Sequence, residues 1–187
     1  LGYAGVDSKK GKISKDEIQD PNYSRHVMLG FNYRMSELQA AAIFGQLERA
    51  HELVDIRLKT AEYFKESISG SDLFVLQEET NDYVNTYWSF SMYINTKNYQ
   101  EDWYRFRKEF IKNGGDHYYA AWKLTYNEPL FKDNIQNNPG IWQIYNENLA
   151  PNAEFLQKRM LQLKTNYWDL NEAEHQAEIL KNTIKNF

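Results

Sequence analysis

One stretch of the sequence carries most of the information about the fold: Gly30-Phe31-Asn32-Tyr33-Arg34-Met35-Ser36-Glu37-Leu38-Gln39-Ala40-Ala41. Its second half predicts the start of a helix, because Ser36 and Gln39 can satisfy each other's backbone N–H groups in a capping box. Its first half places an amide, Asn32, and a guanidinium, Arg34, just before that helix. These groups suit an anion, since the free N–H groups and the dipole of a helix start favour negative charge. An alternative stays open, in which Arg34 pairs with a nearby carboxylate and Asn32 satisfies the turn.

The helix that begins at Ser36 is predicted to be long. Apolar residues recur three or four positions apart from Ala40 to Ile68, which places them on one helical face. Gly70 is a typical C-terminal stop. A helix of about 50 Å usually bridges two domains or forms an oligomer interface. Gly45, inside it, either permits close packing of another backbone or marks a bend.

The residues after Gly70 predict a small α/β domain. Strands are expected at 73–76 and 87–94 and, more weakly, at 161–164. The strand at 87–94 alternates, with one set of side chains formed by Trp88, Phe90, Met92 and Ile94. Helices are expected at 99–112, from Asn152 to Met160 or Leu161, and at 171–186. The inward residues of the first and last of these helices are Trp103, Phe106, Phe110 and Ile111, and Ala173, Ala177, Leu180 and Ile184. Residues 1–35 and 116–140 are expected to be irregular.

The composition excludes several classes of protein. The net charge of −4 and the pI of about 5.6 argue against a broad nucleic-acid interface, which needs a basic excess. The chain has no cysteine, which excludes disulfides and thiolate chemistry and is compatible with a reducing cytoplasm, where we expect the protein to act. No apolar run is long enough for a membrane span, so no membrane partner is expected. The four histidines lack the spacing of a metal site, and no metal is expected.

The stretch at 30–41 resembles the Gly-x-Asn-x-Arg-Met-(Ser/Thr)-Glu-x-Gln-Ala-Ala signature of the DegT/DnrJ/EryC1/StrS family. Its members are fold-type I pyridoxal-phosphate enzymes, mostly aminotransferases that act on nucleotide-linked keto-sugars. Asn127-Glu128-Pro129-Leu130-Phe131 is similar to the family's segment ending in Gln-Pro-x-Phe. The order of the predicted elements also agrees over most of residues 25–187.

The resemblance implies an α/β fold with three parts. Residues 1–35 would be the loop-rich end of a large cofactor-binding domain, 36–70 the long bridging helix, and 71–187 the small C-terminal domain. It also implies a homodimer with pyridoxal 5'-phosphate as cofactor. Asn32 matches the family asparagine that donates to the cofactor phosphate of the other subunit. Arg34 matches the family arginine, and we expect it to hold the loop by an ion pair.

The family's catalytic lysine, which forms the Schiff base with the cofactor, is expected upstream of Leu1. Lys9, Lys10, Lys12 and Lys15 are too close to Asn32 and are interpreted as a surface loop. No catalytic residue is therefore assigned within this chain, which we expect to be inactive alone.

Aromatic residues gather in the segment 116–131, which approaches the sugar nucleotide in the family. The candidate substrate residues are His117, Tyr119, Trp122 and Tyr126. Aromatic faces with His and Lys donors suit a sugar ring and a diphosphate, but a packed aromatic loop is the alternative. Arg25 and His26, just before the signature, form no constellation in the sequence.

Two classes of function follow. The first is transfer of an amino group from glutamate to a nucleotide-linked keto-sugar for surface polysaccharide, such as lipopolysaccharide, or a glycosylated metabolite. A variant is a dehydratase of the same family, in which histidine replaces the lysine. The second is a non-enzymatic regulatory or binding module, in which the long helix and the aromatic surface serve a partner.

Overall fold

The computed structural model describes residues 14–27, 33–137 and 150–187. The chain divides into two compact units, each built from two separate segments. The first unit combines the residues up to Tyr33 with Tyr119–Met160, and the second combines Arg34–Tyr118 with Leu161–Phe187. The division into 1–35, 36–70 and 71–187 stays a prediction.

The second unit is organised around neighbouring strands in the order β1-β2-β4. These are β1 (Phe74–Leu76), β2 (Ser89–Ile94) and β4 (Met160–Lys164), and β1 pairs antiparallel with β2. The three strands predicted from the sequence are thus confirmed. Phe90, Met92 and Ile94 of β2 are buried, as the alternation of this strand predicts.

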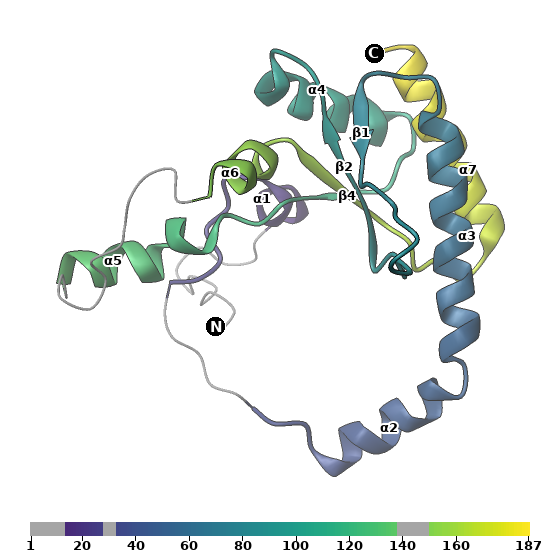
Figure 1. Ribbon diagram of the computed structural model, residues 1–187, viewed down its shortest axis with the longest axis horizontal. Coiled ribbons are helices and arrows are strands. Elements are labelled where there is room, and N and C mark those ends of the chain that lie inside the picture. The colour runs from purple at the N-terminus through teal and green to yellow at the C-terminus, as the bar shows by residue number, and fades with distance from the viewer. Residues whose placement is uncertain (1–13, 28–32, 138–149) are drawn as a thin grey trace. The chain divides into compact units, whose positions relative to one another are not determined.

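Three helices complete the core of the second unit. They are α3 (Ala50–Ile68), α4 (Tyr99–Lys112) and α7 (Leu170–Lys185). α3 and α7 pack side by side (Figure 1). The predicted inward residues Trp103, Phe106 and Phe110 of α4 are buried, and the Phe106 ring meets that of Phe74 edge to face at 4.8 Å.

The long helix predicted from Ser36 is divided in the structure. α2 (Glu37–Leu47) ends before Glu48, and α3 begins at Ala50. At the break, the N–H of Arg49 donates to the carbonyl of Gln46 at 3.1 Å, which is the tighter i to i+3 pattern. Gly45 lies one turn earlier and lowers helix propensity there. Every residue of α2 is exposed, whereas α3 buries Ala61, Phe64 and Ile68.

The start of β2 differs from the prediction. Trp88 was grouped with Phe90, Met92 and Ile94 in the predicted strand, but it precedes the strand and is 78% exposed. Tyr87 is buried instead and has a φ of 48°, in the left-handed region that non-glycine residues rarely adopt. This backbone turn breaks the two-residue alternation ahead of Ser89, which is why Trp88 faces outward.

The first unit contains short elements that the sequence did not predict. They are α1 (Lys15–Gln19), β3 (Tyr119–Ala120), the 3-10 turn η1 (Thr125–Asn127) and α5 (Pro129–Asn137). α6 (Pro151–Gln157) was predicted, although it ends earlier than expected. The side-chain amide of Gln157 donates to the carbonyls of Pro21 at 2.8 Å and Ala121 at 3.3 Å, so it ties three segments of the unit together.

Candidate functional site

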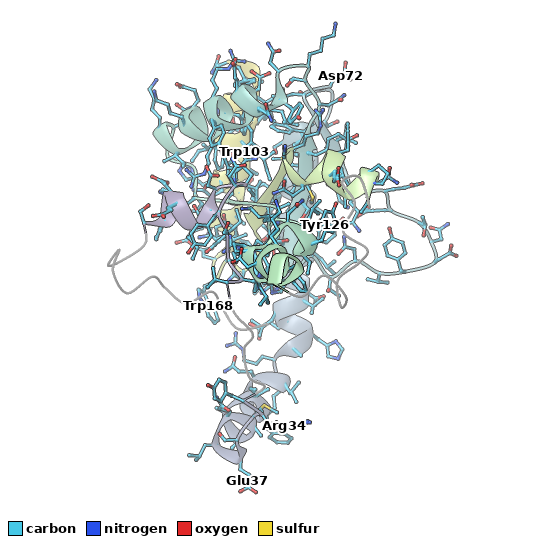
Figure 2. All side chains as sticks on the ribbon, turned by 90° about the vertical axis from the view of Figure 1, so that its left-hand side faces the viewer. Arg34, Glu37, Asp72, Trp103, Tyr126 and Trp168 are labelled. Atoms are coloured by element: carbon cyan, nitrogen blue, oxygen red, sulfur yellow. The ribbon has the colours of Figure 1, made fainter. Side chains whose placement is uncertain are left out.

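The signature stretch enters the described structure at Tyr33. The predicted capping box is confirmed: Ser36 Oγ accepts from the N–H of Gln39 at 3.3 Å, and Gln39 Oε1 accepts from the N–H of Ser36 at 2.9 Å. Arg34 lies at the same end of α2 (Figure 2) and is exposed. Within the described residues Arg34 has no ion-pair partner, so its expected ion pair stays a prediction. Asn32 lies outside the described residues.

A buried carboxylate, Glu128, organises the first unit. It is 1% exposed and separated by 102 positions from His26. Its Oε2 accepts from the N–H of Arg25 at 2.9 Å and of His26 at 3.1 Å, and its Oε1 lies 3.2 Å from Nδ1 of His26. The N–H of Leu130 donates to the carbonyl of His26 at 2.9 Å. The segment that leads into the signature is therefore fastened to the turn before α5.

The neighbouring cation, Arg25, is also buried. Its Nη2 donates to the carbonyl of Ile18, and its guanidinium lies 4.8 Å from the centre of the Trp122 ring and 5.2 Å from that of Tyr23. Such placement over aromatic faces stabilises a desolvated cation. Arg25 Nε has no hydrogen-bond partner among the described residues.

The candidate substrate residues are divided between the two units. Tyr119, Trp122 and Tyr126 belong to the first unit. Trp122 is 46% exposed and contacts Arg25 and His26, whereas the Tyr126 hydroxyl donates to Oε1 of Glu154 at 2.6 Å. His117 belongs to the second unit, where its Nδ1 lies 3.3 Å from Nη2 of Arg107. Their role in binding substrate stays a prediction.

Sequence reasoning missed the group formed by Arg25, His26 and Glu128. Arg25 and His26 were noticed, but each was set aside as a single residue without a partner. The signal available was Glu128-Pro129, a carboxylate ahead of a proline at the first helical position. Nothing in the local pattern connects that carboxylate with His26, because the contact depends on tertiary structure.

Two tyrosines of the second unit have perturbed ionisation. Burial raises the pKa of Tyr167 well above its usual range. The Asp116 carboxylate, which accepts from the Tyr167 hydroxyl at 2.8 Å, raises this pKa further. Burial also raises the pKa of Tyr118, against a smaller opposing effect of Arg107. Both hydroxyls therefore stay protonated near neutral pH and are unsuited to act as bases.

Metal-binding and membrane features were sought over the same residues. Across 14–27, 33–137 and 150–187, no three His, Cys, Asp or Glu side chains are grouped so as to hold a metal ion. Among the helices of these ranges, none has both the length and the apolar character that a membrane span requires.

The sequence pattern that defines the DegT/DnrJ/EryC1/StrS aminotransferase family matches residues 8–181. The chain belongs to this family. The resemblance seen at 30–41 therefore extends over most of the chain. The matched range includes both helix α2 and the group formed by Arg25, His26 and Glu128.

Two proteins of Escherichia coli are similar to this family member in sequence. GDP-perosamine synthase of O157:H7 is 31% identical over 77 residues, which are 41% of this chain and 21% of the synthase. GDP-4-keto-6-deoxy-D-mannose 3-dehydratase of O55:H7 (strain CB9615 / EPEC) is 25% identical over 179 residues, which are 92% of this chain and 43% of the dehydratase. The chain thus spans less than half the length of these relatives.

Solved structures share the fold. PseC of Helicobacter pylori, an aminotransferase involved in the biosynthesis of pseudoaminic acid, matches with a TM-score of 0.66 and 17% identity, over 89% of this chain and 42% of PseC. DesV of S. venezuelae matches with a TM-score of 0.65 and 17% identity, over 88% of this chain and 40% of DesV. The predicted α/β class is confirmed, with a fold like that of sugar aminotransferases.

Proposed function

We propose that this chain forms the C-terminal half of a pyridoxal-phosphate-dependent aminotransferase that moves an amino group from glutamate to a nucleotide-linked keto-sugar. The observation that carries the proposal is the family match over residues 8–181. The names of the similar GDP-perosamine synthase and PseC support a sugar substrate. The product serves surface polysaccharide, such as lipopolysaccharide, or a glycosylated metabolite. The lysine that holds the cofactor belongs, in this proposal, to a region before Leu1.

Pyridoxal phosphate is the proposed cofactor. A structure of the similar E. coli dehydratase contains hydrated PLP. In this chain Asn32 is the proposed donor to the cofactor phosphate of the partner subunit. Arg34, exposed beside the positive end of α2, adds a guanidinium that fits an anionic group. When bound, the cofactor supplies an electron sink for the carbon next to the substrate nitrogen, while these residues hold and orient its phosphate.

A homodimer is part of the proposal, because Asn32 is assigned to the cofactor of another subunit. The exposed surface of α2 supports it. Leu38, Phe44 and Leu47 are 86%, 68% and 60% exposed, which is unusual for large apolar side chains on one helix. A second copy of the chain would cover this surface.

A dehydratase of the same family is the second candidate. It is favoured by the match to GDP-4-keto-6-deoxy-D-mannose 3-dehydratase, which covers 92% of this chain. The residue at the cofactor-binding position upstream distinguishes the two activities: lysine indicates the aminotransferase and histidine the dehydratase. A regulatory or binding module is distinguished from both by an inability to bind the cofactor.

The proposal is tested with the intact protein in a spectrophotometer. Added pyridoxal phosphate should produce the absorbance band of a protein-bound imine, and glutamate should then change that band as the amino group is transferred. Failure to retain the cofactor at all would leave only the binding module. Retention of pyridoxal phosphate without the band of a protein-bound imine would favour the dehydratase, because histidine cannot form an imine with the cofactor.

The role of Asn32 is tested by Asn32→Ala in the intact protein. Loss of a donor to a charged phosphate should weaken cofactor retention by about 1.5–3 kcal/mol, with an unchanged melting temperature of the cofactor-free protein. Asn182→Ala is the matched control, because Asn182 lies on the exposed face of α7 and its side-chain amide donates to Oε1 of Glu178 on the same helix at 3.1 Å. Equal cofactor affinity in the two variants would contradict the proposed role of Asn32 as a donor to the cofactor phosphate.

A further inference from the structure

The connection between β1 and β2 is a compact surface loop. Adjacent antiparallel strands can be joined by as few as about two residues, yet residues 77–88 join β1 to β2. The Tyr83 hydroxyl donates to the carbonyl of Glu78 at 2.5 Å, which closes the loop on itself. Nζ of Lys65 in α3 donates to Oε1 of Glu79 at 2.6 Å and anchors the loop to that helix. Long loops that are held in this way frequently carry a function.

The loop ends in a strained turn that directs Trp88 outward. Tyr87 is buried and has a φ of 48°. A bulky residue in this region is strained, and the strain persists only where the surroundings hold it. Here Thr165 Oγ1 donates to the carbonyl of Tyr87 at 2.5 Å, and Nη1 of Arg57 donates to the carbonyl of Trp88 at 2.9 Å. Strained turns of this kind gather at functional sites, so a contact at Trp88 is expected.

A second exposed tryptophan comes from the adjoining segment. Thr165 Oγ1 also lies 3.4 Å from the carbonyl of Trp88, and Trp168 follows Thr165 directly after β4. Figure 2 shows Trp168 at the margin of the second unit, away from Trp103 in the core. Val84, Trp88 and Trp168 are 80%, 78% and 77% exposed, and we name these three residues the tryptophan surface. Exposed apolar side chains that gather in this way mark sites of protein contact.

A cover within the same polypeptide fits the tryptophan surface best. Two indoles that stayed exposed in the free protein would promote aggregation, which disfavours a partner that binds only at times. Self-association is assigned to α2 in the proposed function. The length of the relatives leaves room for a cover, because this chain matches only 42% of PseC and 40% of DesV, so more than half of each lies outside the matched part.

We propose that the tryptophan surface docks against the part of this protein that precedes Leu1, within the same polypeptide. This inference rests on the proposed function, which assigns the lysine that holds the cofactor to that part. Arg57 and Thr165 fix the backbone at Trp88, so its indole is positioned before contact and loses little freedom on docking. The contact holds the second unit against the region that carries the cofactor.

The first test is photo-cross-linking of the intact protein that carries Val84→p-benzoylphenylalanine. Val84 is 80% exposed, so the substitution should leave the fold unaltered. Irradiation should join position 84 to a peptide that precedes Leu1 of the same chain, as identified by mass spectrometry. Tyr104→p-benzoylphenylalanine is the matched control on α4, where the ring is 43% exposed, and it should give no such product.

The occupant is read from the mass of the product. A cross-linked species of twice the chain mass would make a second copy the cover and would overturn the inference. So would a yield of the intramolecular product no higher than that of the Tyr104 control. The absorbance response to pyridoxal phosphate and glutamate is measured on the same samples. A cross-link without that response would count against the proposed function alone, and the response without the cross-link against this inference alone.

Hydroxyl-radical footprinting of the unaltered intact protein is an independent test that needs no substitution. Indoles react with the radical at least as fast as phenols when both are open to solvent. Trp88 and Trp168 are more exposed than Tyr104 in the described chain, so they should be oxidised faster if nothing covers them. We expect both to be oxidised more slowly than Tyr104, at protein concentrations above and below dimer dissociation. Faster oxidation of the two tryptophans, or protection that is lost on dilution, would overturn the inference.

Discussion

Helices α2 and α3 continue one apolar pattern, yet only α3 finds its partner within the described chain. α3 buries Ala61, Phe64 and Ile68 beside α7, whereas each residue of α2 is exposed. The periodicity of the sequence is the same in both. It therefore predicts that a face becomes covered in the functional protein but does not identify what covers it. Stability measurements on variants of the two helices should distinguish a helix that is covered within the chain from one that is not.

The largest expected effect is that of Phe64→Ala in α3. Phe64 is 1% exposed, and its ring lies 5.3 Å from that of Phe90. Removing it should lower the free energy of unfolding by about 3–5 kcal/mol, measured by urea denaturation. Phe44→Ala in α2 is the control and, under dissociating conditions, should change this quantity by less than about 0.5 kcal/mol. Equal losses would mean that α2 is covered within the same chain.

Gly115→Ala should have the next largest effect, within the covered region. A Cβ at this position would lie 2.5 Å from atoms of the Phe110 ring, which is itself 1% exposed and has no room to move away. Overpacking of this kind should cost about 1–3 kcal/mol of unfolding free energy. Thermal and urea unfolding measure it, and an unaltered stability would show that the core around α4 is loosely packed.

Gly45→Ala should act in the opposite direction. Among the described residues, no atom lies within 4 Å of a Cβ at Gly45, so alanine should stabilise the helix by about 0.5–1 kcal/mol. Sedimentation equilibrium on the same variant sharpens the comparison. Weaker self-association would indicate that another backbone packs at Gly45, whereas unaltered association would leave the bend as its role. A lower unfolding free energy of the dissociated chain would contradict the open environment of α2.

The smallest effect is expected for Tyr118→Phe. The Tyr118 hydroxyl is buried and has no hydrogen-bond partner among the described residues, so its removal should change the unfolding free energy at neutral pH by no more than about 1 kcal/mol. Burial raises the folded-state pKa of Tyr118 above the unfolded value of about 10. Its contribution is thus fully present below about pH 10 and is lost as the pH rises, because only the unfolded chain ionises readily. The variant should lose stability less steeply above about pH 10 in pH-dependent urea titrations; an identical alkaline decline would exclude this tyrosine as its source.

Local patterns predicted much of the fold. The capping box of Ser36 and Gln39 and the bounds of α4 at Tyr99 and Lys112 are as expected, because both depend on contacts within a few residues. Trp88 was wrongly included in the predicted strand, because the aromatic sequence does not indicate that Tyr87 adopts a left-handed backbone conformation. α5 was missed although Pro129 is a typical first helical residue, because the surrounding segment lacks a clear apolar period.

The candidate site was predictable only in part. The signature pointed to Asn32 and Arg34 through a resemblance, and the aromatic segment pointed to Trp122. The link between His26 and Glu128 spans 102 positions, and no periodicity or spacing rule connects residues at that distance. Contacts between residues so far apart in the sequence are outside the reach of pattern arguments, and this one becomes visible only when the chain is folded.

Both compact units are discontinuous, and this has a consequence for biosynthesis. Ribosomes add about 5–20 residues per second, so the segment with His26 emerges long before Glu128 can meet it. The apolar face of α3 likewise stays bare on the nascent chain until α7 is translated. Neither unit can complete its fold until its second segment has been translated. Apolar side chains therefore stay accessible to chaperones on the growing polypeptide during that interval.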